Sequence, residues 1–123
     1  STQAKTLFPY TTLFRSGKDT PEEIAKFYLD AGVSLVVIKL GAEGAYYAAT
    51  QEAAYVPGFP VNLVVDTVGA GDGFAAGVIS GMLEGLSVQN AVRRGAWIGA
   101  RAVQVLGDTE GLPTRAQLAE AQL

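Results

Sequence analysis

The chain reads Asp66-Thr67-Val68-Gly69-Ala70-Gly71-Asp72 where an apolar run over residues 61–65 gives way to an amphipathic helical pattern. Two glycines around one alanine allow a tight turn that exposes successive backbone N–H groups. A helix that starts there adds unpaired amides and the positive end of its dipole, so the turn is predicted to bind an anion. Asp72 puts a carboxylate inside this turn, which a simple phosphate cradle would avoid. The combination indicates a site that deprotonates a hydroxyl beside a phosphate, as phosphoryl transfer requires.

Composition excludes several classes of protein. The chain has no cysteine and no histidine, which excludes disulfides, thiolate metal sites and a Ser-His-Asp triad. Its net charge of −3 offers no basic surface for nucleic acid or for an anionic membrane. No apolar run approaches the roughly 18–20 residues of a membrane span, and no signal-peptide pattern is seen. We therefore predict a cytoplasmic enzyme, or part of one, with no nucleic-acid and no membrane partner.

Helical patterns and buried strands alternate from residue 17 onwards. Thr20-Pro21-Glu22-Glu23 is a capping box with proline at the first helical position, so a helix is expected from there to about residue 31. Three further helices are expected, over residues 71–83, over residues 87–105 and after Thr114. Four strands are expected, over residues 34–40, 45–49, 53–56 and 61–65. This alternation predicts an α/β fold with helices layered around a mainly parallel sheet.

Side-chain patterns on these elements predict how they pack. One side of the helix over residues 71–83 carries Phe74, Val78, Met82 and Leu83. The next helix carries a stripe of small residues that suits close backbone packing: Ala91, Gly95, Gly99 and Ala102. Arg93 and Arg94 are expected on a solvated helix face. The larger aromatic residues are expected in the core or on the sheet surface: Tyr46, Tyr47, Tyr55 and Trp97.

Residues 1–16 differ from the rest. They contain Leu7-Phe8-Pro9-Tyr10-Thr11-Thr12-Leu13-Phe14-Arg15-Ser16, which has neither helical nor strict strand periodicity. This decapeptide resembles a translated sequencing adapter of the kind found at the ends of assembled gene fragments. We expect residues 1–16 to be non-native and the genuine sequence to begin near Gly17, with the protein extending upstream. The alternative is an ordinary strand and loop.

Several readings of the glycine motifs compete. As a dinucleotide fingerprint, Gly69-Ala70-Gly71 has Phe74 where a small residue is needed and no acidic residue about 20 residues on. As a Walker motif, Gly17-Lys18 is followed by Asp19 instead of Ser or Thr. Lys39-Leu40-Gly41-Ala42-Glu43-Gly44 leaves the end of a buried strand, where open α/β sheets bind ligands, although an ordinary hairpin turn also fits. For Asp66 and Asp72, the alternative is that both only cap the helix.

Taken together, the motifs resemble those of a known family. The segment Asp66-Thr67-Val68-Gly69-Ala70-Gly71-Asp72-Gly73-Phe74 is similar to the C-terminal signature of the ribokinase-like (PfkB) carbohydrate kinases. The segment over residues 39–44 is similar to their nucleotide loop, and Gly107-Asp108-Thr109-Glu110-Gly111-Leu112-Pro113 to their tail. The resemblance implies that residues 17–123 are the C-terminal part of a three-layer ribokinase-like kinase domain. Within the family, the tail looks most like 2-keto-3-deoxygluconate kinases.

The resemblance implies ATP-dependent phosphorylation of a hydroxyl on a sugar or sugar acid, with Mg²⁺ as cofactor. Asp72 matches the catalytic base, and Gly69, Ala70 and Gly71 match the anion hole. The nucleotide-binding positions are Lys39, Gly41, Gly44, Gly69, Gly71 and Ala96. Ala96 stands near a position that is often asparagine, which leaves its contact open. Asp66 and the Val68 carbonyl match positions that hold a monovalent cation, such as K⁺, in some members.

Other functional parts of the family do not match anything in this chain. The sugar-binding residues, the β-sheet lid and the Asn-x-x-Glu magnesium motif lie N-terminal to the matched region. The chain alone is therefore expected to be inactive, and a homodimer is expected only for the full-length protein. The alternatives are a fructokinase or ribokinase, a hydroxymethylpyrimidine-type kinase of the same fold, or a nucleotide-binding module without catalysis.

Overall fold

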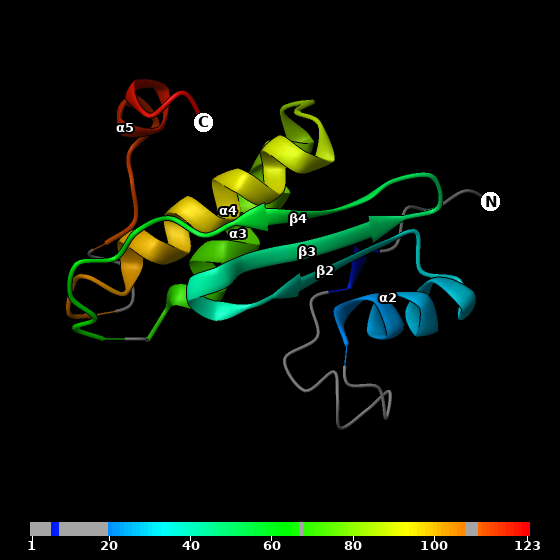
Figure 1. The fold of residues 1–123 in the computed structure, drawn as a ribbon. Helices are drawn as coiled ribbons and strands as arrows, with labels where there is room; N and C mark the ends of the chain where they lie inside the picture. Colours follow the sequence, from blue (N-terminus) through cyan, green and yellow to red (C-terminus); the bar gives the residue numbers. More distant parts are fainter. Residues whose placement is uncertain (1–5, 8–19, 67, 108–110) are drawn as a thin grey trace.

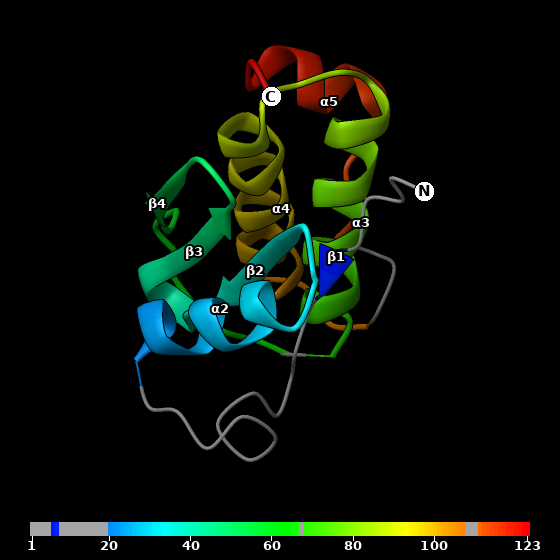
Figure 2. The same cartoon turned by 90° about the vertical axis from the view of Figure 1, so that its right-hand side faces the viewer.

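A single sheet lies between helices in the structure, which is a computed structural model that describes residues 6–7, 20–66, 68–107 and 111–123 (Figure 1). The helices are α2 (Pro21–Asp30), α3 (Ala70–Leu83), α4 (Val88–Ala102) and α5 (Arg115–Glu120), with the short 3-10 helix η1 (Gly41–Glu43). The strands are β1 (Thr6–Leu7), β2 (Leu35–Lys39), β3 (Gly44–Ala49) and β4 (Ala53–Pro57), in the spatial order β1-β2-β3-β4. Figure 2 shows α2 on one face of this sheet and the pair α3 and α4 on the other.

Alternation along β2 explains why both faces are covered. Successive side chains of a strand point to opposite faces. Leu35 and Val37 belong to the core that includes α3 and α4, whereas Val36 and Ile38 belong to the core against α2. The buried strand predicted over residues 34–40 is confirmed as β2. The predicted layers of helix on both faces of the sheet are confirmed as well.

The direction of the strands corrects the prediction of a mainly parallel sheet, which is wrong for the described residues. Only β1 and β2 pair in parallel, while β2 with β3 and β3 with β4 pair antiparallel. The reason is the length of the connections. Parallel neighbours need a crossover of about a dozen residues or more, which α2 supplies between β1 and β2. The turns at residues 40–43 and 50–52 are too short for that, so they form hairpins.

The predicted strand over residues 61–65 is also wrong, because this segment belongs to no strand. The N–H groups of Val65 and Asp66 both donate to the carbonyl oxygen of Val103, at 2.7 and 3.1 Å, just beyond α4. The end of this segment is thus hydrogen-bonded to the C-terminal end of α4 and not to a neighbouring strand. Three of the segment's apolar side chains remain exposed, namely Leu63 at 68%, Val64 and Val65.

Small residues bring α3 and α4 together, as the stripe on α4 predicts. A β-carbon on Gly81 would lie 2.8 Å from the Cα of Ala91, and one on Gly95 would lie 2.6 Å from the carbonyl oxygen of Phe74. Phe74 and Val78 are buried, but Leu83 is 83% exposed. The predicted position of Leu83 beside Phe74 is wrong, because at 3.6 residues per turn Gly77 and Gly81, and not Leu83, continue the face of Phe74.

Arg94 is the clearest departure from a solvated face. Arg93 is exposed as predicted, whereas Arg94 is only 4% exposed. Its guanidinium donates to Glu84 at 2.6 Å, to the Ser80 hydroxyl at 3.1 Å and to the main-chain oxygen of Leu123 at 2.9 Å. These bonds tie the C-terminal residues to the end of α3, where α5 lies in Figure 2.

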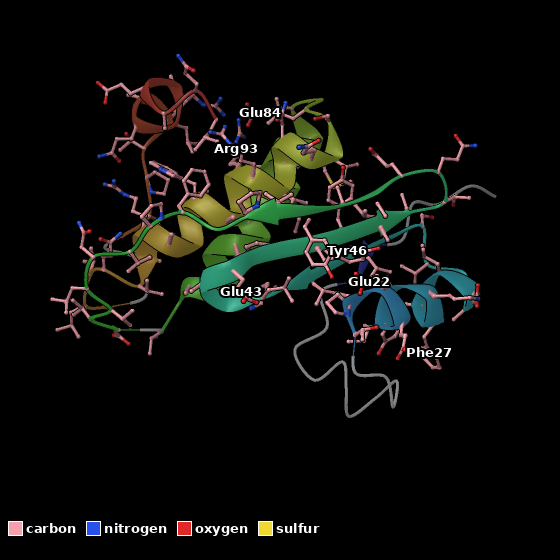
Figure 3. The ribbon with its side chains drawn as sticks, viewed as in Figure 1. Glu22, Phe27, Glu43, Tyr46, Glu84 and Arg93 are labelled. Atoms are coloured by element: carbon pink, nitrogen blue, oxygen red, sulfur yellow. The ribbon has the colours of Figure 1, made fainter. Side chains whose placement is uncertain are left out.

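The helix α2 is fixed to the sheet through aromatic side chains. Thr20 caps the helix by accepting from the Glu23 N–H, as the capping box predicts. The Tyr55 hydroxyl donates to Glu22 at 2.5 Å and the Tyr55 ring lies 4.7 Å from that of Tyr46. Figure 3 shows Tyr46 beside Glu22, with Phe27 on the outer face of α2. Tyr46 and Tyr47 are buried and Tyr55 is exposed on the sheet, which confirms the prediction for these tyrosines.

The segment over residues 1–16 is described only at Thr6–Leu7, which form β1 and pair with Leu35 and Val36. The rest of it lies outside the described residues, as do Asp108, Thr109 and Glu110 of the tail motif. The non-native origin of residues 1–16 remains a prediction. In the described part of the chain, no helix is both long and apolar enough to cross a membrane.

Candidate active site

The glycine turn begins α3. Gly69 is the N-cap with φ at 82°, a left-handed conformation that glycine adopts without steric cost. The Gly73 N–H bonds to the Gly69 carbonyl at 2.8 Å. The N–H groups of Ala70, Gly71 and Asp72 come before that bond, so helix geometry leaves them without an intrahelical acceptor. The turn thus presents three amides and the positive end of a helix that runs from Ala70 to Leu83.

A cavity of about 520 Å³ lies against this turn. Six of the predicted site residues line it: Lys39, Gly41, Gly44, Ala70, Gly71 and Ala96. The other lining residues are almost all small or apolar: Ala42, Gly58, Phe59, Val61, Val64, Phe74, Gly99, Ala100 and Val103. Gly69 and Asp72 adjoin the lining residues in sequence on either side. The volume lies within the usual range for small-molecule sites, about 300–1,000 Å³.

Lys39 and Asp72 place opposite charges close to the glycine turn. Lys39 ends β2 and lines the cavity, and Asp72 is exposed on the first turn of α3. Burial lowers the pKa of the Lys39 ammonium, and the negative charge of Asp72 partly opposes that shift. Because the charges of Lys39 and Asp72 interact, a phosphate at the turn would have both a cation and a carboxylate nearby.

The glycine loop after β2 is packed against the loop after β4. Gly44 has φ at 103°, and a β-carbon there would lie 2.0 Å from the Val56 carbonyl oxygen. A β-carbon on Gly58 would lie 2.3 Å from the Ala42 carbonyl oxygen. Sequence reasoning missed Gly58 and its neighbour Phe59 as site residues. The available signal was the bracketing of this loop by Pro57 and Pro60, directly after a strand.

The wall on α4 is made of small residues. Ala96 is buried, and a β-carbon on Gly99 would lie 3.5 Å from the Ala70 carbonyl oxygen. The close approach of α3 and α4 therefore sets the width of the cavity near the anion turn. The Ala96 side chain is a methyl group with no side-chain amide. This wall therefore supplies apolar contacts where an asparagine would supply hydrogen bonds.

The Asp66 side chain stabilises the backbone next to the turn through two hydrogen bonds. Its carboxylate accepts from the Val68 N–H at 2.9 Å and from the Gly107 N–H at 3.2 Å. These two hydrogen bonds lower the pKa of the Asp66 carboxyl, and the bond from Val68 has the larger effect. The side chain thus links the start of α3 to the segment after α4. Within the described ranges, no three His, Cys, Asp or Glu side chains group together as metal ligands would.

Comparison with known proteins identifies the family, since the profile of the pfkB family carbohydrate kinases matches residues 10–115. The chain belongs to this family. A 2-dehydro-3-deoxygluconokinase from Bacillus subtilis is 58% identical over 104 residues, which are 85% of this chain and 32% of that kinase. This similarity agrees with the predicted likeness to 2-keto-3-deoxygluconate kinases.

Solved structures of pfkB-type proteins share the fold. A PfkB protein from Polaromonas sp. JS666 is 52% identical with a TM-score of 0.80, over 94% of this chain and 36% of that one. A ribokinase from Arabidopsis thaliana, complexed with ribose and ATP, is 29% identical with a TM-score of 0.83, over 94% and 40%. The chain is thus a ribokinase-like α/β structure that spans about a third of the length of the curated relatives it matches.

Proposed function

We propose that this chain supplies the catalytic base and half of the nucleotide site of an ATP-dependent kinase for a sugar acid of the 2-keto-3-deoxygluconate type. One observation carries the proposal. A single cavity brings the N-terminus of α3, Lys39 and the glycine loop together, and Asp72 follows directly after the cavity-lining Gly71. The 58% identity to the Bacillus subtilis kinase supports the choice of acceptor.

In the proposed reaction, Asp72 takes the proton from an acceptor hydroxyl. The hydroxyl oxygen then bonds to the terminal phosphorus of ATP, and the bond from that phosphorus to the bridging oxygen breaks, so ADP leaves with the electron pair. The amides of Ala70, Gly71 and Asp72 and the dipole of α3 stabilise the negative charge on the transferred group. The products are a phosphate ester, ADP and the protonated carboxyl of Asp72.

The nucleotide would lie along the cavity, with its phosphates at the anion turn. We assign Lys39 as a cation beside the phosphates, and Gly41, Gly44 and Ala96 as contacts of the nucleotide. Mg²⁺, when bound, would neutralise phosphate charge. We assign its ligands and the sugar-binding residues to the remainder of the kinase, so this chain is expected to be inactive alone. A homodimeric, cytoplasmic full-length protein remains a prediction.

The monovalent cation, K⁺, at Asp66 and the Val68 carbonyl is a separate proposal. Asp66 already accepts two amide hydrogen bonds, which supports a bracing role with or without the cation. Assays of the complete kinase in KCl and in tetramethylammonium chloride at equal ionic strength would distinguish the two. Equal rates would leave Asp66 as a brace alone.

The substrate assignment is tested on the complete kinase from its full reading frame. ADP release would be followed with 2-keto-3-deoxygluconate, fructose, ribose and hydroxymethylpyrimidine. We expect the highest kcat/KM with the sugar acid. A higher value with fructose, ribose or the pyrimidine would reassign the substrate. ATP binding without phosphorylation of any acceptor would indicate a nucleotide-binding module without catalysis.

A further inference from the structure

Phe59 lines both the large cavity and a second hollow. The second hollow measures about 300 Å³ and is lined by Phe59, Pro60, Trp97, Ala100, Arg101 and Gln104. Phe59 and Ala100 line both spaces. Phe59 therefore belongs to the part of the large cavity that the loop after β4 contributes.

The ring is held from two directions. The guanidinium carbon of Arg93 on α4 lies 5.4 Å from the centroid of the Phe59 ring, within range of a cation–π contact. On the backbone side, Gly58 is packed so closely on the Ala42 carbonyl that a β-carbon would not fit. The loop position of Phe59 is thus fixed against the glycine loop, and its ring is fixed against α4. Figure 3 shows Arg93 on α4, on the opposite side of the sheet from α2.

The cavity has two chemically different parts. The polar part carries Lys39 and the amide-rich turn at Ala70 and Gly71. The apolar part is lined by Phe59, Ala96 and other residues without polar side chains. A nucleotide has the same division, since its phosphates are anionic and its base is flat and largely apolar. Aromatic rings favour stacked or edge contacts with such flat groups.

We propose that Phe59 contacts the base of a purine nucleotide and that Arg93 is a positioning residue that holds the Phe59 ring. This inference rests on the proposed function, because it requires a nucleotide in the large cavity. It assigns base recognition to a loop side chain that lies outside the matched motifs over residues 39–44, 66–74 and 107–113. Arg93 acts only through the ring.

The test measures dissociation constants of the complete kinase by titration calorimetry, with two probes. ATP carries the base, whereas inorganic triphosphate has the phosphates without it. We expect Phe59→Ala to weaken ATP binding roughly tenfold, in keeping with the loss of a base–aromatic contact. Triphosphate binding should be unchanged. Phe59→Leu keeps an apolar side chain without the ring, and it should show the same pattern if Phe59→Ala fails to fold.

Arginine variants test the positioning role. Arg93→Met removes the cation and should weaken ATP binding by a smaller factor, while Arg93→Lys keeps a cation and should restore most of it. Arg115→Met, which alters an exposed arginine on α5 paired with Glu84, is the matched control and should leave both probes unaffected. Identical ATP affinity in Arg93→Met and wild type would overturn the role of Arg93.

The remaining outcomes separate this inference from the proposed function. Equal weakening of ATP and triphosphate by the Phe59 variants would mean that Phe59 only supports the fold, which overturns the base contact. Unchanged ATP affinity in Phe59→Leu would overturn it as well. If the wild-type kinase binds neither probe, the nucleotide site itself is refuted and the proposed function fails with it.

Discussion

Gly77 and Gly95 hold α3 and α4 in backbone contact: a β-carbon on Gly77 would lie 2.7 Å from the Cα of Gly95. The contact matters for the site because α3 carries Asp72 and the anion turn, while α4 carries the cavity wall at Ala96 and Gly99. A side chain at this crossing would separate the two helices and widen the cavity. The spacing of the site is therefore set by glycines that lie outside it.

Gly95→Ala should destabilise the fold by about 1–3 kcal/mol, because its β-carbon would meet the Phe74 carbonyl at 2.6 Å and overpack the crossing. Gly99→Ala is the matched control on the same helix. Its nearest contact would be an ordinary 3.5 Å, and replacing a helical glycine by alanine gains about 0.5–1 kcal/mol. Urea unfolding of both variants checks the prediction. Similar effects of the two substitutions would contradict it.

Asp72→Asn should remove catalysis while leaving nucleotide binding intact, because the amide keeps the size of the side chain but cannot accept the hydroxyl proton. A general base contributes roughly 10²–10⁴-fold to the rate. We expect kcat of the complete kinase to fall by about that factor, with the dissociation constant for ATP nearly unchanged. Near-normal turnover would refute the assignment of Asp72 as base.

Lys39→Gln should weaken ATP binding more than it lowers kcat, because Lys39 is the one charged residue among the described residues that line the cavity. A hydrogen bond to a charged group contributes about 1.5–3 kcal/mol, which corresponds to roughly 10–150-fold in affinity. Lys26→Gln is the control, since Lys26 is exposed on the outer side of α2 and pairs with Asp30. Titration calorimetry with ATP measures both, and an equal response of the two variants would argue against a role for Lys39.

Asp66→Asn should lower stability at neutral pH, and the difference from wild type should disappear in acid. The pKa of Asp66 in the folded chain lies below its ordinary value of 3.8, because Val68 and Gly107 donate to the carboxylate. Such a group contributes stability above its unfolded pKa and loses it as the pH falls through the folded pKa. Thermal unfolding of both proteins from pH 7 down to about pH 2 measures the difference, because the contribution is lost only as the pH falls through the lowered folded pKa. If the difference in stability between the variant and the wild type stays constant with pH, the charge of the Asp66 carboxylate does not contribute to stability.

Sequence reasoning was most successful where one local signal decides the structure. Thr20 and Thr114 both cap helices as predicted, and the Gly69-Ala70-Gly71 turn does begin a helix. Six predicted site residues meet in one cavity because the nucleotide loop follows β2 directly and the anion turn opens α3. Short-range spacing and glycine chemistry were sufficient for those features.

The failures share a different cause, since they depend on partners that are distant in sequence. An apolar run such as residues 61–65 fits a strand, but its N–H groups at Val65 and Asp66 bond to Val103 after α4. The sequence around Arg94 predicts a surface residue, because it does not show that Glu84 and Leu123 lie within hydrogen-bond distance of its guanidinium. Phe59 gains a role only through Arg93, which comes from another element.

Two groups of sequence neighbours account for most of the described fold: the meander of β2, β3 and β4, and the hairpin of α3 and α4. Each closes through short connections, at a small entropic cost, and local contacts of this kind favour fast folding. The glycine loop over residues 39–44 forms within the meander, and the glycine turn at Gly69 forms at the start of the helical hairpin. The cavity lies between these two units, so the contacts that pack them together also set the shape of the candidate ligand site.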